Sequence, residues 1–147
     1  MAMISKAAAN WSGDLLGGGG SVTATSSGIF SDQAITWRAR TEASEGKTSP
    51  EELLASAHAA CYSMAVSHEL AQAGFVPERV PTSVMVTADK TDSGWTVLSS
   101  AITVKAKVPG ADEALFLEKA NAAKGGCPIS KALSDSVEIT LDATLEA

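Results

Sequence analysis

The sequence has few cysteines and histidines and fewer basic than acidic residues, and these shortages narrow what the protein can do. Its 147 residues include two cysteines and two histidines, and 11 Lys and Arg stand against 17 Asp and Glu. The net charge of -6 and the pI near 4.8 argue against binding to nucleic acid, which requires a basic face, and against adsorption to acidic lipid. We therefore expect small-molecule chemistry or contacts with other proteins.

Long apolar runs are also missing. No run approaches the roughly 18 apolar residues of a membrane-spanning helix, and Met1 to Ala9 lacks the apolar stretch of a signal peptide. The expectation is a soluble, cytoplasmic protein. With 45% hydrophobic residues and no linker or repeat, residues 1–147 are expected to form a single domain.

The two cysteines, Cys61 and Cys127, have three possible uses. In a reducing compartment they do not form a permanent structural disulfide, so they are buried hydrophobes, metal ligands or a redox pair. His58 with both cysteines would supply three zinc ligands, but there is no C-x-x-C pair and no identified fourth ligand. The residues favour redox chemistry over zinc. A non-catalytic dimer whose cysteines bind a metal or only pack stays as the alternative.

A long helix is predicted from Glu51 to Gly74. Ser49 is a good N-cap, Pro50 suits the first helical position, and the acidic residues after it complement the helix dipole. Gly74 is a typical residue to end a helix.

One face of this helix carries apolar residues at three- and four-residue intervals, and we expect that face to be buried with Cys61 at its middle. Its members are Leu53, Leu54, Ala57, Ala60, Cys61, Met64, Ala65 and Ala71. Many of them are small, so another backbone is expected to approach closely beside the cysteine.

The remaining patterns predict an α+β fold with mainly antiparallel sheet. Strands are expected at Met3 to Trp11, Ser21 to Thr25, Ala34 to Thr41, Thr82 to Asp89, Trp95 to Lys107 and Val137 to Leu145. Gly17 to Gly20 is expected to be a flexible connection. Shorter helices are expected at Ala111 to Lys124, stopped by Gly125-Gly126, and at Pro128 to Leu133.

The surroundings of the two thiols differ in this prediction. Cys127 precedes Pro128 as the N-cap of a helix, where the dipole and unpaired N–H groups favour a thiolate. Burial of Cys61 in the middle of the long helix should raise its pKa unless a cation lies close. Arg38 and Arg40 are the candidates, because alternation along a strand sends both to one face.

Glu51 is suited to hold such an arginine, because a carboxylate and a guanidinium form a fork of two hydrogen bonds. Glu51 and Cys61 are ten residues apart on one helix, about 15 Å at 1.5 Å per residue. We therefore expect two copies of this helix to pack antiparallel in a dimer, which brings Glu51 of one subunit towards Cys61 of the other.

The cysteine motifs are long and specific. The segment Thr48-Ser49-Pro50-Glu51-Glu52-Leu53-Leu54-Ala55-Ser56-Ala57-His58-Ala59-Ala60-Cys61-Tyr62-Ser63-Met64-Ala65, with Gly126-Cys127-Pro128-Ile129-Ser130, resembles the OsmC/Ohr family of thiol-dependent peroxidases. The similarity extends to Trp11-Ser12-Gly13-Asp14 and Ile139-Thr140-Leu141-Asp142. Ala-His-Ala-Ala-Cys-Tyr is more similar to the osmotically inducible OsmC branch than to the organic hydroperoxide resistance branch.

This resemblance implies an OsmC-like intertwined homodimer, with two long central helices surrounded by a six-stranded sheet from each chain. It implies that Cys61 is the peroxidatic cysteine and Cys127 the resolving cysteine, and that Glu51 and an upstream arginine activate Cys61. The sequence around Arg40 fits the family better than that around Arg38. The implied activity is reduction of organic hydroperoxides in stress defence. It needs no cofactor beyond an external dithiol reductant, for which the family suggests dihydrolipoyl groups.

Overall fold

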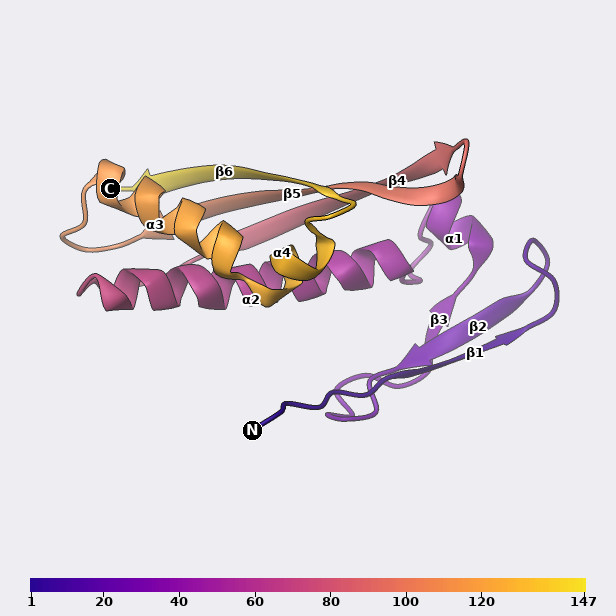
Figure 1. Ribbon diagram of the computed structural model, residues 1–147. Coiled ribbons are helices and arrows are strands. Elements are labelled where there is room, and N and C mark those ends of the chain that lie inside the picture. Colours follow the sequence, from indigo (N-terminus) through magenta and orange to yellow (C-terminus); the bar gives the residue numbers. More distant parts are fainter. The chain divides into compact units, whose positions relative to one another are not determined.

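The order of elements in the computed structural model is β-β-β-α-α-β-β-α-α-β (Figure 1). The structure describes residues 1–147, which divide into two compact units, Met1–Leu53 and Leu54–Ala147. Three of the four strand pairings are antiparallel and one is parallel. The predicted α+β composition with mainly antiparallel pairing is therefore confirmed.

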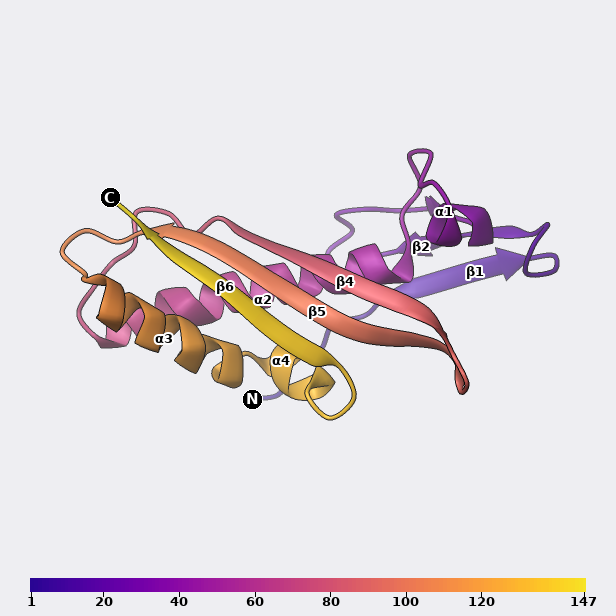
Figure 2. The same ribbon diagram turned by 90° about the horizontal axis from the view of Figure 1, so that it is seen from above.

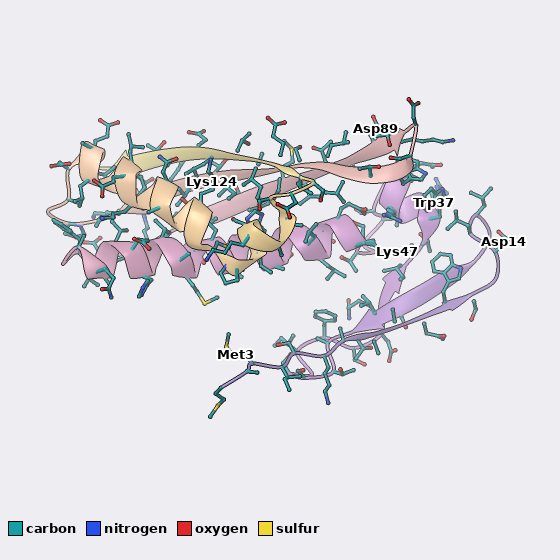
Figure 3. The ribbon with its side chains drawn as sticks, viewed as in Figure 1. Met3, Asp14, Trp37, Lys47, Asp89 and Lys124 are labelled. Carbon is teal, nitrogen blue, oxygen red and sulfur yellow. The ribbon has the colours of Figure 1, made fainter.

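The unit Met1–Leu53 contains the strands β1 (Ala8–Ser12), β2 (Gly19–Thr23) and β3 (Gln33–Ile35), paired antiparallel in that order. Asp14 lies in the turn between β1 and β2 (Figure 3), where its carboxylate accepts the N–H of Gly17 at 2.7 Å. Strand β2 begins two residues earlier than predicted, so Gly19 and Gly20 are not a flexible connection. A Cβ atom at Gly20 would overlap Asn10 O of β1, and only glycine fits this close approach.

The strand predicted at Ala34 to Thr41 is wrong beyond its first residues. Strand β3 ends at Ile35, and Trp37–Thr41 form a short helix, α1. Thr36 caps this helix, because its hydroxyl accepts the N–H of Ala39 at 3.1 Å. Residues two apart on a helix do not share a face, so Arg38 and Arg40 have separate surroundings.

The long helix α2 spans Pro50–Gln72, close to the predicted range. Ser49 Oγ accepts the N–H of Glu52 at 3.1 Å, which confirms it as the N-cap. Gly74 has a φ of 87°, a left-handed conformation that glycine adopts without strain.

The unit Leu54–Ala147 contains a sheet of β4 (Thr82–Thr91), β5 (Gly94–Lys107) and β6 (Glu138–Glu146), with β5 in the middle (Figure 2). Strand β5 pairs antiparallel with β4 and parallel with β6. The six strands therefore form two sheets of three strands each. The prediction of a single six-stranded sheet from each chain is wrong for the isolated chain. The strands of the first sheet all precede α2 in the sequence, and those of the second sheet all follow it.

The helices α3 (Glu113–Gly126) and α4 (Pro128–Leu133) precede β6. Gly125 and Gly126 do not stop α3 as predicted. The helix runs through both glycines and ends at Gly126, and its C-cap is Cys127, whose φ of -60° and ψ of 123° are the extended conformation that a following proline favours. Cys127 is thus both the last cap of α3 and the N-cap of α4.

The core lies where α2 and α3 pack on one face of the second sheet (Figure 1). Its buried residues are Tyr62, Val66, Leu70, Ile102, Val104, Ala106, Val108, Phe116, Ala120 and Ala123. The predicted buried face of α2 is therefore wrong, because Ala57, Ala60, Met64 and Ala71 are exposed. Tyr62, Val66 and Leu70 remove more apolar area from water than alanines do, so the helix turns that face inward.

Candidate active site

The two cysteines are neighbours in the unit Leu54–Ala147. Their Sγ atoms are 2.8 Å apart, both are free thiols, and Cys127 donates to Cys61. Cys61 lies near the middle of α2 and is half-buried, whereas Cys127 is fully buried at the junction of α3 and α4. A disulfide bond is about 2.05 Å long, so a small movement is enough to join them.

The environment of Cys61 raises its pKa overall, although one contact acts in the opposite direction. Burial raises the pKa of Cys61 most, and the hydrogen bond and charge interaction with the neighbouring Cys127 sulfur raise it further. The backbone N–H of Ile129, in the first turn of α4, lowers the pKa of Cys61 by a hydrogen bond to its sulfur. The start of this helix was expected to act on Cys127, whose side chain makes no capping hydrogen bond. Sequence reasoning missed Ile129, although it lies in the recognised motif.

Arg40 and Glu51 form a two-pronged ion pair in the unit Met1–Leu53. Arg40 Nε lies 3.1 and 3.0 Å from the two carboxylate oxygens of Glu51, and Arg40 Nη2 lies 2.6 Å from Glu51 Oε1. The guanidinium also lies 5.5 Å from the ring centroid of Trp37, which Figure 3 labels in α1. The ion pair with Glu51 and the contact with the Trp37 ring together hold the guanidinium in one orientation.

Arg38, the other candidate, has different partners. It lies 3.1 Å from Glu42 and 3.4 Å from Glu45, and its side chain is 65% exposed, against 33% for Arg40. Of the predicted site residues, the structure thus brings Arg40 to Glu51 and Cys61 to Cys127. Each pair is complete within its own unit.

His58 is fully buried one turn before Cys61 and has serine partners on both sides of its ring. Its Nδ1 lies 2.7 Å from Ser100 Oγ and its Nε2 lies 2.8 Å from Ser130 Oγ. Burial lowers the pKa of His58. Since both ring nitrogens already have partners, His58 does not fit the zinc site considered from the sequence, and no group of three or more His, Cys, Asp or Glu is placed to hold a metal ion.

A hollow of about 580 Å³ lies along the exposed side of α2. Met64, one turn after Cys61, lines it together with Ala71 and Val80. Ser63, Ser67 and His68 supply its polar groups. Through Met64, the hollow therefore places apolar surface one helical turn from Cys61.

Comparison with known proteins agrees with the cysteine motifs. A family model described as OsmC-like protein matches residues 43–142. The chain is 41% identical over 147 residues to Peroxiredoxin OsmC of Escherichia coli (strain K12), with 100% of both chains covered. It is 31% identical over 117 residues to Organic hydroperoxide resistance protein OhrA of Bacillus subtilis (strain 168), covering 76% of this chain and 77% of the relative.

Solved structures share the fold over nearly the whole chain. The crystal structure of OhrB of Bacillus subtilis superposes with a TM-score of 0.72 at 24% identity, covering 96% of this chain and 98% of that one. An OsmC-like protein from Mycoplasma pneumoniae gives 0.75 at 15% identity, with 100% of both chains covered. No helix combines the length and apolar character needed to cross a membrane. By its sequence match and its fold, the chain belongs to the OsmC-like protein family.

Proposed function

We propose that this protein is a thiol-dependent peroxidase that reduces organic hydroperoxides at Cys61 and resolves the product with Cys127. The observation that carries the proposal is the pair of free thiols 2.8 Å apart. The names of its relatives, a peroxiredoxin and organic hydroperoxide resistance proteins, support the same reaction. No prosthetic group is required, since cysteine carries the chemistry.

In the first step the Cys61 thiolate attacks the terminal oxygen of the hydroperoxide. A sulfur–oxygen bond forms and the oxygen–oxygen bond breaks, so that Cys61 becomes a sulfenic acid and the alkoxide leaves, taking up a proton as the alcohol. The Ile129 N–H, which hydrogen-bonds to the sulfur, favours the thiolate that this step needs.

In the second step the Cys127 sulfur attacks the sulfenic acid, a disulfide forms and water leaves. An external dithiol, of which dihydrolipoyl groups are one type, then reduces the disulfide and is itself oxidised to a disulfide. Because Cys127 is fully buried and Cys61 is half-exposed, the reductant is expected to attack at Cys61 and release Cys127.

Arg40 is the proposed activating cation, and Glu51 holds it in place. A guanidinium near the peroxide would favour the thiolate and stabilise charge on the leaving oxygen. We propose that residues 1–147 act as one domain in a homodimer, in which Arg40 and Glu51 of one copy serve Cys61 of the other. The exposed Ala57, Ala60 and Met64 of α2 support this arrangement, because an apolar helix face of small residues suits a second helix.

The apolar surface along α2 should favour alkyl hydroperoxides over hydrogen peroxide, because each Å² of substrate buried contributes about 25 cal/mol. Steady-state turnover with cumene hydroperoxide and with hydrogen peroxide, using a dithiol such as dithiothreitol, tests this. We expect a kcat/KM at least about tenfold higher for cumene hydroperoxide, which corresponds to about 1.4 kcal/mol. Equal values would contradict an apolar substrate site.

A further inference from the structure

His58 is a buried titratable side chain that the proposed chemistry does not use. It lies on α2 with an exposed fraction of 0%, and its two ring nitrogens bind hydroxyl groups from two other elements. Ser100 belongs to β5 and Ser130 to α4. The imidazole therefore joins three elements at one point, three residues before Cys61.

The two anchors of this ring differ in rigidity. Ser100 is in the central strand of its sheet, where it pairs with Val86 of β4 and Ile139 of β6. Ser130 is in a helix of six residues, too short to be stable on its own, and it is the only buried residue of that helix. The hydrogen bond between the His58 ring and the Ser130 hydroxyl is thus a buried polar contact between α2 and α4.

Helix α4 and its cap supply both of the groups that act on Cys61. Cys127, three residues before Ser130, brings its sulfur to 2.8 Å from Cys61. The backbone N–H of Ile129, the residue directly before Ser130, acts on the same sulfur and lowers its pKa. A rotation of α4 about its contact with His58 would move both groups together.

We infer that His58 is a positioning residue, which through Ser130 holds α4 so that the Cys127 sulfur and the Ile129 N–H both meet Cys61. The inference rests on the proposed function in one respect, because it assumes that the reaction includes closure of a Cys61–Cys127 disulfide, which the position of α4 assists. Disulfide closure demands sulfur atoms aligned within a narrow range of distance and angle, so a shift of α4 slows it without removing either cysteine.

The test is the rate of disulfide closure in Ser130→Ala and His58→Gln, started by diamide. This reagent takes two electrons and two protons from the two thiols and becomes the hydrazine, so no peroxide is involved. We expect closure slower by about tenfold or more in both variants, because a displacement near 1 Å has effects of this size. Ser134→Ala is the matched control at the C-cap of α4, since its exposed hydroxyl bonds only to Lys131 O, at 3.1 Å, and it should close at the wild-type rate.

A second readout separates positioning from a general loss of stability. With excess organic hydroperoxide, slow closure leaves the Cys61 sulfenic acid open to a second peroxide, so Ser130→Ala should accumulate the sulfinic acid, measured by intact mass. Wild-type closure in folded Ser130→Ala overturns the inference, and so does loss of the near-ultraviolet circular dichroism of the fold in either variant. If wild type closes with diamide yet does not turn over hydroperoxide, the peroxidase proposal fails while the role of His58 stands.

Discussion

Two arginines of the short helix α1 differ in how firmly they are held. Arg40 makes a fork with Glu51 and lies against Trp37, whereas Arg38 makes exposed pairs with Glu42 and Glu45. Exposed pairs of this kind contribute about 0–1 kcal/mol and leave the side chain mobile. A cation that stabilises a transition state must be placed before the reaction begins, and Arg40 meets that condition.

Arg40→Ala should therefore slow the oxidation of Cys61 by cumene hydroperoxide by about a hundredfold, the usual effect of removing one preorganised electrostatic contact. The measurement is the second-order rate constant for loss of the Cys61 thiol, followed by stopped flow in the Cys127→Ser background. Arg38→Ala is the matched control and should react at the wild-type rate. The assignment would be wrong if the two variants exchanged these results.

The buried His58 makes a prediction about pH. Because burial lowers the pKa of His58 in the folded state, only the unfolded chain takes up a proton there as pH falls below about 6.5. Its contribution to stability is therefore present above that pH and is lost as pH falls towards the folded pKa.

Thermal unfolding measured at about pH 7.5 and about pH 5.5 checks this linkage. The wild-type midpoint should fall on acidification, and the fall should be smaller in His58→Gln, which cannot take up the proton. His68→Gln, which changes an exposed histidine of the same helix, should keep the wild-type difference. An undiminished fall in His58→Gln would show that other groups cause the acid sensitivity.

Among the elements, α1 shows what alternation alone cannot decide. The segment Trp37 to Arg40 reads equally well as a strand, since a large apolar residue and alanine alternate with arginines. Two local hydrogen bonds favour the helix over the strand. One runs from Ala39 N–H to Thr36 Oγ1, and the other from Glu42 N–H to Arg38 O at 2.8 Å. Local capping of this kind outweighs a two-residue period over so short a segment.

The long helix α2 shows a different limit. Its ends were predictable from Ser49, Pro50 and Gly74, because each has a specific backbone role. Its buried face was not, since two apolar stripes run along it. One carries small residues and the other carries Tyr62, Val66 and Leu70, and the sequence does not say which faces the chain's own sheet.

The exposed stripe gives a prediction about assembly. Met64→Lys would bury an unpaired charge between two copies of α2, which costs several kcal/mol, so the dimer dissociation constant should rise by about a hundredfold or more. Analytical ultracentrifugation over a range of concentrations measures it. Met85→Lys, on β4, is the control, because the two methionines are 67% and 66% exposed but only Met64 lies on α2. A wild-type dimer that tolerates Met64→Lys would exclude this face as the interface.

For the whole molecule, regular spacings predicted the α+β composition because they report local structure, whereas the pairing of Cys61 with Cys127 was implied only by the resemblance of their motifs to a known family. The division into two sheets and the parallel pairing of β5 with β6 depend on contacts between distant segments, which spacing does not encode. The same holds for Ser100, which meets His58 across 42 positions of sequence. These long-range contacts are what place α4 beside the thiol.

The central claim is that Cys61 and Cys127 form a peroxidatic and resolving pair. The most direct test is a thiol count and an intact mass before and after one equivalent of cumene hydroperoxide, on wild type, Cys61→Ser and Cys127→Ser. The account predicts that wild type loses both thiols and two hydrogen atoms, that Cys127→Ser stops at the sulfenic acid or its overoxidised forms, and that Cys61→Ser keeps its thiol. Survival of both thiols in folded wild-type protein would contradict it.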